Sequence, residues 1–428
     1  MRGFIVLILL AGIVLLLVGC FSPNIPPLSE ETTDSGPLKV SLWGLQTNDQ
    51  RQVAFEDSVR AFNLQHTEIQ IVPYYYENEA YKNKMRVAMV SGNLPDIYYY
   101  WFGESFTRMI DSQIVVDLTD MLAQKPVFRD QFYPEALQYA SHNDRIYGIP
   151  HSVQHVVIWY NKALFKKYNL QPPETWEELI SVIKILNNNG VSPISVAGKE
   201  RWPLLHWFSY LAHRIGGPSP FELAVNGSGD FTHPSFIQAG VLFRQLIQND
   251  AFIQGYLGLD MSTAEKHFLT GETAMYMQGD WIAGKLLNDD RQEDNIGYFR
   301  FPTVNGMGSI TEYHGGYSSG WAISKTTNQK EAFEVIAFLM SEGERRKYVE
   351  ASGVPTSVQD MDISELNLST ASADYLRFIN KDATAYFGFY DQEIDHRRAQ
   401  LLMDAIVSFT SEEEISDVDI RTILGGVR

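Results

Sequence analysis

The pattern of hydrophobic and polar residues predicts strands that alternate with helices in the first part of the chain. Residues 38–43 (LKVSLW) read as a strand, whereas Phe55, Val59 and Phe62 recur at the spacing of one helix face. The predicted order is strand 38–43, the helix with these three residues, strand 69–75, helix 80–90 and strand 97–101. Such alternation is typical of βαβ units with a largely parallel sheet.

A second alternating series occupies the middle of the chain. It comprises a strand over 153–161, a helix that starts at the capping box of Thr175 and Glu178, and a strand over 194–196. Residues 330–340 predict a further helix. Because 428 residues are too many for one compact core, the two series predict two α/β lobes.

The stretch 268–284 (FLTGETAMYMQGDWIAG) places a large indole directly after a turn. Residues 274–278 suit a short strand, Gly279-Asp280 breaks it, and 282–287 resembles the start of a helix. Trp281 at this junction either plugs the edge of a core or faces a cleft as a stacking surface. Taken alone, the pattern favours the core, because large aromatic residues mostly serve packing.

The N-terminus carries the longest apolar run of the chain. Residues 4–18 (FIVLILLAGIVLLLV) fit the apolar region of a secretory signal and are shorter than the roughly 20 residues of a membrane-spanning helix. The run ends at Gly19-Cys20, which resembles a bacterial lipobox. We therefore expect a lipoprotein signal peptide over 1–19 and a lipidated Cys20; the alternative is an uncleaved membrane anchor.

The segment after Cys20 is rich in Pro, Ser, Thr and acidic residues. Such a composition buries too little apolar surface to fold, so residues 20–37 are expected to be a flexible tether. An ordered N-terminal arm is the alternative. The body of the protein is expected outside the cytoplasmic membrane, anchored to it through Cys20.

Charge and composition narrow the classes of partner. The net charge of −18 offers no basic stripe for phosphates, so no nucleic acid is expected as a partner. Cys20 is the only cysteine, which leaves neither a disulfide framework nor a cysteine metal site. The common hydrolase, zinc-protease and nucleotide-binding motifs do not occur. We expect no cofactor, no bound metal and no catalytic activity.

Tryptophans close to acidic residues suggest a carbohydrate site instead. Aromatic planes cover the apolar faces of sugar rings, and carboxylates or amides satisfy the hydroxyls. The chain has Trp101 near Glu104, Trp202 near Glu200, and Asp280 next to Trp281. Trp43, Trp101 and Trp281 also lie at or just beyond the ends of predicted strands, where ligands of parallel α/β sheets bind. Trp159 lies within a predicted strand and is expected in the core.

Several short motifs, in a characteristic order, resemble those of the extracellular solute-binding proteins that include the maltose- and oligosaccharide-binding proteins of ABC importers. The resemblance covers residues 38 to about 428. The motifs are 92–97 (GNLPDI), 147–150 (YGIP), 160–162 (YNK), 172–179 (PPETWEEL), 268–275 (FLTGETAM), 279–281 (GDW), and 315–316 (GG) before 321–324 (WAIS). The resemblance implies an α/β, two-lobed, periplasmic-binding-protein-like fold with a ligand cleft between the lobes and crossing hinge segments.

The resemblance also implies boundaries and site residues. The crossings would fall near 149–150, 299–302 and 323–324, so that lobe 1 is 38–150 plus 300–323 and lobe 2 is 151–299 plus 324–428. In relatives the aromatic that closes the G-x-W turn often stacks on ligand, which favours the cleft position for Trp281. The expected ligand-binding residues are Trp43, Trp101, Glu104, Gln154, Trp202, Asp280, Trp281, Gly316 and Tyr317.

The function implied is that of a lipid-anchored, monomeric receptor. It would capture a carbohydrate, expected to be an oligosaccharide, and deliver it to the transmembrane permease of an ABC transporter. Two alternatives stay open from the sequence. One is a secreted lipoprotein enzyme that acts on polysaccharide, and the other is a sugar sensor for a membrane kinase.

Overall fold

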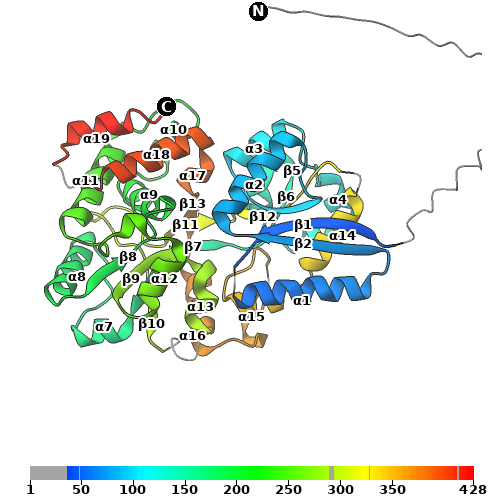
Figure 1. The fold of residues 1–428 in the computed structure, drawn as a ribbon, viewed down its shortest axis with the longest axis horizontal. Coiled ribbons are helices and arrows are strands. Elements are labelled where there is room, and N and C mark those ends of the chain that lie inside the picture. Colours follow the sequence, from blue (N-terminus) through cyan, green and yellow to red (C-terminus); the bar gives the residue numbers. More distant parts are fainter. Residues whose placement is uncertain (1–35, 48, 289–293, 327, 360, 412–413) are drawn as a thin grey trace, which may run out of the picture. The chain divides into compact units, whose positions relative to one another are not determined.

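The computed structural model describes residues 36–428, except residues 48, 289–293, 327, 360 and 412–413. The expected signal peptide (1–19), Cys20 and almost all of the tether (20–37) therefore lie outside the described residues. Among the described helices, none is both long and apolar enough to cross a membrane. Residues Leu38–Arg428 form one compact unit, which is built around two sheets (Figure 1).

The first sheet has five strands in the order β2-β1-β3-β12-β6. Strands β1, β2 and β3 run parallel, as the βαβ pattern predicts, whereas β12 is antiparallel to both β3 and β6. Their bounds are Leu38–Leu45 (β1), Ile69–Tyr76 (β2), Ile97–Trp101 (β3), Gly148–Pro150 (β6) and Ser319–Ile323 (β12). The fourth strand in space thus comes from a distant part of the chain.

Helices on both faces of this sheet complete the first lobe. Asp49 caps α1, and the predicted inner face contributes Val59 and Phe62 to a core with Val40, Leu42 and Phe333. The helices are α1 (Gln50–Gln65), α2 (Asn78–Ser91), α3 (Glu104–Asp111), α4 (Thr119–Gln124), α5 (Pro126–Arg129), α6 (Pro134–Tyr139) and α14 (Gln329–Leu339), with a hairpin of β4 (Ser141–His142) and β5 (Arg145–Ile146).

The second sheet is mixed, with the order β13-β11-β7-β9-β8 and β10 also paired to β7. The bounds are Gln154–Asn161 (β7), Ser192–Ser195 (β8), Thr273–Gly279 (β9), Ile296–Phe299 (β10), Glu312–Gly316 (β11) and Ala385–Phe387 (β13). All residues of β9 are buried because both of its faces are covered. The alternation read from 274–278 therefore belongs to a central strand without a solvent face.

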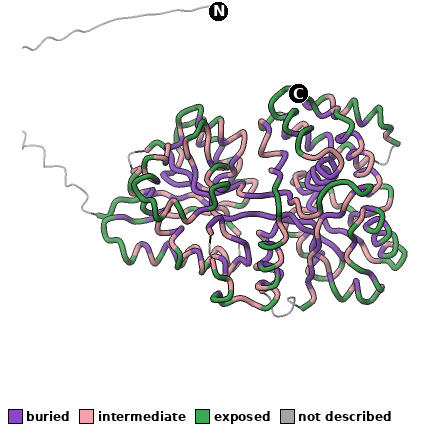
Figure 2. The backbone as a smooth tube through the Cα atoms, turned by 180° about the vertical axis from the view of Figure 1, so that it is seen from behind, coloured by how far each residue is buried: buried purple, intermediate pink, exposed green. Residues whose placement is uncertain are grey.

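The helices of the second lobe surround this sheet. The predicted capping box of Thr175 and Glu178 is present at the start of α8, and α9 is buried along most of its length. The elements are α7 (Lys162–Lys167), α8 (Trp176–Asn188), α9 (Trp202–Gly216), α10 (Ser219–Val225), α11 (Pro234–Gln248), η1 (Tyr256–Gly258), α12 (Met261–Leu269), η2 (Asp280–Ile282), α13 (Ala283–Leu287), α15 (Glu342–Ser352), η3 (Ile363–Glu365), α16 (Thr370–Asp382), α17 (Tyr390–Glu393), α18 (His396–Ser408) and α19 (Asp417–Leu424). Figure 2 shows that exposed residues concentrate on the outer helices and buried residues on the strands.

The structure corrects two of the expected crossings between the lobes. Strands β10 and β11 both pair with β7, so the chain stays in the second lobe through 299–302 and crosses only between Gly316 and Ser319. Helix α14 packs in the first core, so no crossing lies at 323–324. Residues 300–316 thus belong to the second lobe and α14 to the first, because strand pairing, which local sequence does not encode, decides membership.

Helix α15 is the element that joins the lobes after α14. It contacts α1 of the first lobe and α13 of the second. Its Val349 clusters with Leu366 and Leu376, and the following α16 packs Tyr375 and Ile379 into the second lobe. Residues after α15 still contact the first lobe, where Val358 pairs with Phe132 and the Gln359 N–H donates to the Gln131 carbonyl. The chain therefore returns to the second lobe only after residue 359.

Candidate ligand-binding site between the lobes

Two expected tryptophans, one from each lobe, meet around a single lysine. Trp101 is the last residue of β3, and Trp202 is the first residue of α9. The Nζ atom of Lys82 on α2 lies 5.5 Å from the ring centroid of Trp101 and 5.8 Å from that of Trp202. The ammonium of Lys82 is also 2.9 Å from Glu79 Oε1. The site therefore combines two aromatic faces with a charged pair.

The start of α9 positions Trp202 through an unusual backbone turn. Arg201, the residue before the helix, has a φ of 66°, which is rare for a side chain other than glycine. The guanidinium of Arg201 is held by Gln400 at 2.8 Å and by Asp404. These bonds on α18 stabilise the turn that sets the direction of Trp202.

Trp281 is placed beside Trp202 by the end of β9. Its ring centroid lies 6.2 Å from Trp202, 6.3 Å from His206 and 6.1 Å from Phe389. It is partly buried and packs at the edge of two hydrophobic clusters. Trp281 is thus neither a fully enclosed core residue nor a surface residue.

Buried polar atoms without a partner lie next to these rings. Glu200 Oε2, Trp202 Nε1 and both ring nitrogens of His206 are buried and have no hydrogen-bond partner among the described residues. Such atoms are costly unless water or a ligand satisfies them. The side chain of His206, one helical turn after Trp202, is only 3% exposed and its ring lies 5.2 Å from that of Trp202.

Burial also shifts the acid–base behaviour of these groups. Burial raises the pKa of Glu200, and the nearby Asp260 and Glu79 act in the same direction. Burial lowers the pKa of His206 to about 3, assisted by the positive charge of Lys82. At neutral pH the imidazole is therefore uncharged and has both a donor and an acceptor to offer.

Helix α17 supplies carboxyl groups to the same region. Burial raises the pKa of Asp391, which Lys82 partly opposes, and burial likewise raises the pKa of Glu393. Glu393 accepts a hydrogen bond from the hydroxyl of Tyr139 in the first lobe. The Arg86 guanidinium is 2.8 Å from His396 Nε2, so α2 also contacts α18. The two lobes are therefore in contact around the tryptophans.

Asp280 has a different role from the expected acceptor for ligand hydroxyls. It is completely buried, and its oxygens accept from the His155 backbone at 3.2 Å, from His155 Nδ1 at 2.8 Å and from the Tyr375 hydroxyl at 3.2 Å. His155 Nε2 in turn lies 3.1 Å from the Tyr386 hydroxyl. The carboxylate is thus used internally, where it fixes the turn before Trp281, and this corrects the expectation of a direct ligand contact.

Gln154 and Gly316 lie where the chain passes between the lobes. Gln154 Nε2 donates to Ser319 Oγ at 3.2 Å, and its Oε1 accepts from Ser318 at 3.1 Å. The Tyr99 hydroxyl of the first sheet is 2.6 Å from the same Ser319 Oγ. Gly316 pairs with Gln154 and has a φ of 92°. These residues connect the crossing segments to each other.

Within the described part of the chain, three of the expected residues make their ring and ion-pair contacts away from the Trp101–Trp202 pair. The ring of Trp43 lies 5.6 Å from Tyr76, and Lys84 Nζ is 4.7 Å from it, so these neighbours all belong to the first lobe. Glu104 pairs with Arg108 on its own helix at 2.9 Å. Tyr317 lies between Tyr133 of the first lobe and Tyr386 of the second, at 6.0 and 5.9 Å.

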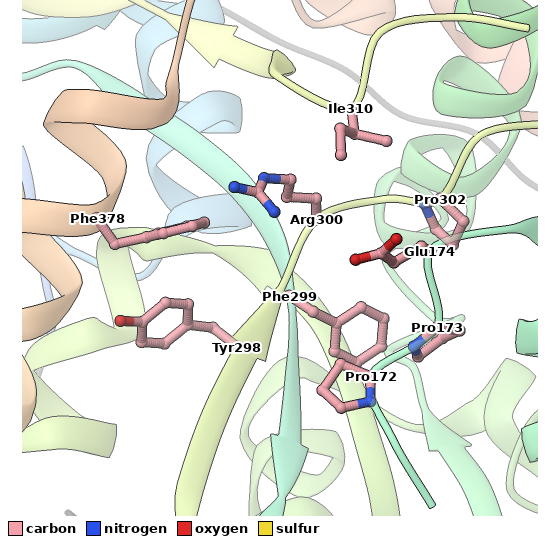
Figure 3. A pocket seen from close by; sticks show the side chains of 9 residues that line it. All are labelled: Pro172, Pro173, Glu174, Tyr298, Phe299, Arg300, Pro302, Ile310 and Phe378. Carbon is pink, nitrogen blue, oxygen red and sulfur yellow. The ribbon is translucent and has the colours of Figure 1, made fainter.

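Two surface hollows lie elsewhere, and no expected binding residue lines either of them. The first, of about 170 Å³, is formed within the second lobe by prolines and aromatic side chains around Arg300 (Figure 3). The second, of about 450 Å³, lies around Arg129 and Gln359. In the described part of the chain, no three His, Cys, Asp or Glu side chains gather as metal ligands do.

Three of the tryptophans expected from the sequence lie at this candidate site, whereas its polar groups were not expected. Lys82, His206 and Asp391 were not named as site residues, and Glu200 was noted only as a neighbour of Trp202. The i, i+4 spacing of Lys82 and Arg86 on a predicted helix was a readable signal. This spacing does not indicate toward which lobe the two cationic side chains point.

Comparisons with known proteins agree with this architecture. The profile of the family described as bacterial extracellular solute-binding protein matches residues 47–346. An ABC transporter extracellular-binding protein of Pyrococcus horikoshii is 25% identical over 316 residues, which are 72% of this chain and 70% of that protein. The melibiose/raffinose/stachyose-binding protein MelE of Bacillus subtilis is 22% identical over 368 residues, which are 82% of this chain and 80% of MelE.

A solved structure from work on xylan utilisation by the thermophilic bacterium Caldanaerobius polysaccharolyticus has the same fold. Its TM-score against this chain is 0.84 at 25% sequence identity, and the match covers 91% of this chain and 100% of the other.

Proposed function

The chain belongs to the family of bacterial extracellular solute-binding proteins, and we propose that it captures a carbohydrate between its two lobes. The observation that carries this proposal is the meeting of Trp101 and Trp202, from different lobes, beside unpartnered polar atoms. Flat apolar faces and buried hydrogen-bonding groups are what a sugar ring requires. A ligand held by residues of both lobes stabilises the closed form over the open one.

We propose an oligosaccharide rather than a single sugar as the ligand. Trp281 continues the aromatic surface beyond Trp202, so more than one ring could find a stacking partner. The relative MelE is named for melibiose, raffinose and stachyose, which supports this size class.

We propose that the protein captures its ligand for import into the cell. The closed, loaded form would be recognised by the membrane subunits of an ABC importer, and a lipid on Cys20 would keep the monomeric receptor at the membrane. The sequence from Phe4 to Cys20 supports the anchor. The intact mass of the mature protein tests it, because a lipidated chain starts at Cys20 and a secreted, unmodified one does not.

A thermal-shift screen tests the capture of sugar. A form that starts at Gly36 is heated with a panel of monosaccharides, neutral oligosaccharides and polyols. A ligand that binds only the native state raises its melting temperature, and a concentration a hundredfold above Kd contributes about 2.7 kcal/mol. We expect at least one oligosaccharide to give this shift and Trp202→Ala to lose it.

Two results would contradict the proposal in different ways. If no sugar of the panel shifts the melting temperature, carbohydrate capture is wrong. If chromatography shows that a bound oligosaccharide is shortened during incubation, the protein is an enzyme that acts on polysaccharide. Recovery of the intact sugar at one equivalent per chain is the expected result.

A further inference from the structure

We propose that the ammonium of Lys82 occupies the aromatic faces of Trp101 and Trp202 and that a sugar ring must displace this ammonium to bind there. Lys82 thereby sets the affinity of the receptor for sugar. This inference rests on the proposed function. It concerns a residue that reaches across from α2 to the second lobe and that covers the aromatic faces on which a ligand would stack.

Helix α2 directs one polar face toward the second lobe. Glu79, Lys82 and Arg86 lie at i, i+3 and i+7, so they share that face, while Tyr81 and Met85 are buried in a second hydrophobic cluster of the first lobe. Lys82 reaches Trp202, and Arg86 reaches His396. Two contacts from a single helix therefore hold the lobes together at the site.

The ammonium of Lys82 is attracted to this position from several sides. Two indole rings of opposite lobes lie at 5.5 and 5.8 Å, and Glu79 pairs with the ammonium at 2.9 Å. The charge of Lys82 also acts on the second lobe, where it opposes the burial that raises the pKa of Asp391 and helps burial to lower the pKa of His206. A cation over an indole face is favourable, and more so when water is excluded.

A sugar ring and this ammonium compete for the same surfaces. A pyranose that stacks on Trp101 or Trp202 needs the face that the ammonium covers, so binding must first move Lys82 away. Each cation–π contact at a partly exposed site corresponds to roughly two- to fivefold in an equilibrium constant. The side chain of Lys82 is 31% exposed, which leaves it a path to solvent while it keeps Glu79 as a partner.

Lys84 provides a matched comparison on the same helix. Its Nζ lies 4.7 Å from the ring of Trp43 and 4.8 Å from that of Tyr76, both in the first lobe. The two lysines therefore make the same kind of contact, but only the contact of Lys82 spans the lobes. Removal of the charge at Lys84 separates a general effect of helix charge from the specific effect at Lys82.

Calorimetry on two variants tests the inference with the sugar that gives the largest thermal shift. Lys82→Met keeps the length and apolar stem but removes the charge, and it is expected to lower Kd by roughly three- to tenfold. Lys84→Met is expected to stay within about twofold of the wild type. Unchanged or weaker binding by Lys82→Met would overturn the inference, because Lys82 would then be no competitor of the sugar.

The contact between Lys82 and Trp202 can also be tested without sugar, and therefore independently of the proposed function. Melting temperatures of Lys82→Met, Trp202→Leu and the double variant form a cycle that reports the contact between these two residues. We expect the melting temperature of the double variant to fall by less than the sum of the decreases in the two single variants. Additive losses would refute the contact itself. If the residues are coupled but no variant binds any sugar, both the displacement and the proposed function are wrong.

Discussion

Trp281 illustrates how one side chain can serve two structural roles. It follows the turn that Asp280 fixes, packs at the edge of two hydrophobic clusters and contacts Trp202. Trp159, in contrast, is completely buried, and its Nε1 donates to the Gln278 carbonyl at 3.1 Å. The two indoles are therefore a natural pair for separating binding from stability.

Replacement of Trp281 by alanine should affect binding more than folding. Loss of one aromatic surface against a sugar is expected to weaken affinity by about ten- to a hundredfold, which corresponds to about 1–3 kcal/mol. Trp159→Ala should instead cost about 3–5 kcal/mol of unfolding free energy, because it opens a core cavity. Urea unfolding and calorimetry on both variants measure the two effects. A large stability loss in Trp281→Ala with unchanged affinity would return Trp281 to the core.

At this scale the sequence predicts the apolar half of the site better than the polar half. Trp101, Trp202 and Trp281 are expected from the sequence because they lie beside acids or strand ends and aromatic planes cover sugar rings, and the structure places Trp202 near both of the others. Lys82 could not be singled out, because a lysine on an amphipathic helix ordinarily lies in solvent. The sequence suggests that Asp280 contacts the ligand, because its burial cannot be read from the neighbouring residues. The burial depends on His155 and Tyr375, which are distant in the chain.

Among the elements, the junction of β7 with β11 depends on a glycine at one position. Gly315 pairs with His155 and has a φ of 141°. A Cβ atom at this position would lie 2.1 Å from the Gln154 carbonyl oxygen, closer than any real contact allows. The strand that leads into the crossing at Gly316–Ser319 can therefore approach β7 only without a side chain.

Gly315→Ala is expected to destabilise the protein by at least about 2 kcal/mol, because both the backbone angle and the close approach become unfavourable. Gly343→Ala is the control. Gly343 lies in α15 with open space where a Cβ would be, so alanine should be neutral or stabilise by up to about 1 kcal/mol. Urea unfolding measures both. Equal stability of the Gly315→Ala variant and the wild type would show that β11 can shift away from β7.

Local signals predicted the elements, whereas long-range pairing did not follow from them. The alternation over 38–101 and the capping box at Thr175 predicted βαβ units and the start of α8, as found. The position of β12 between β3 and β6 was not predictable, because nothing in residues 319–323 identifies the neighbouring strands. The expected crossing at 299–302 was wrong because β10 and β11 pair with β7, and the one at 323–324 was wrong because α14 packs in the first core.

For the whole molecule, buried histidines predict a loss of stability in acid. Burial lowers the pKa of His206 to about 3 and that of His151 to about 4, and it lowers those of His213 and His314 as well. An unfolded histidine has a pKa of about 6.5. The unfolded chain therefore binds more protons between about pH 4 and 6.5, and these groups destabilise the fold as the pH falls through that window.

His206→Phe isolates this contribution. Below about pH 6, one such histidine changes the unfolding free energy by about 1.4 kcal/mol per pH unit, so the variant should show a slope flatter by about that amount. The comparison with the wild type is needed because Glu200 and Asp391, whose pKa values are raised, favour folding in acid. Exposed His66, replaced by phenylalanine, is the control. Identical slopes for wild type and His206→Phe between pH 7 and 5 would contradict a buried neutral imidazole.

The resemblance that the sequence motifs indicated is confirmed at the scale of the family and the two-lobed α/β fold. The family motifs lie at turns and strand ends, so they define the order of elements well. Under the proposed function, the choice of ligand would depend on a few side chains that face each other across the lobes. Those contacts, such as Lys82 with Trp202, join residues that are far apart in the chain.

The strand order of the first sheet has a consequence for how the protein is made. Strand β12 lies between β3 and β6, yet it follows them by more than half of the second lobe. During synthesis the first sheet therefore stays incomplete until residue 323 has emerged, when about three quarters of the chain exists. Until then β3 presents an unpaired edge, which is prone to wrong pairing. No single cut can yield a complete first lobe, so we expect the two lobes to fold only as one chain.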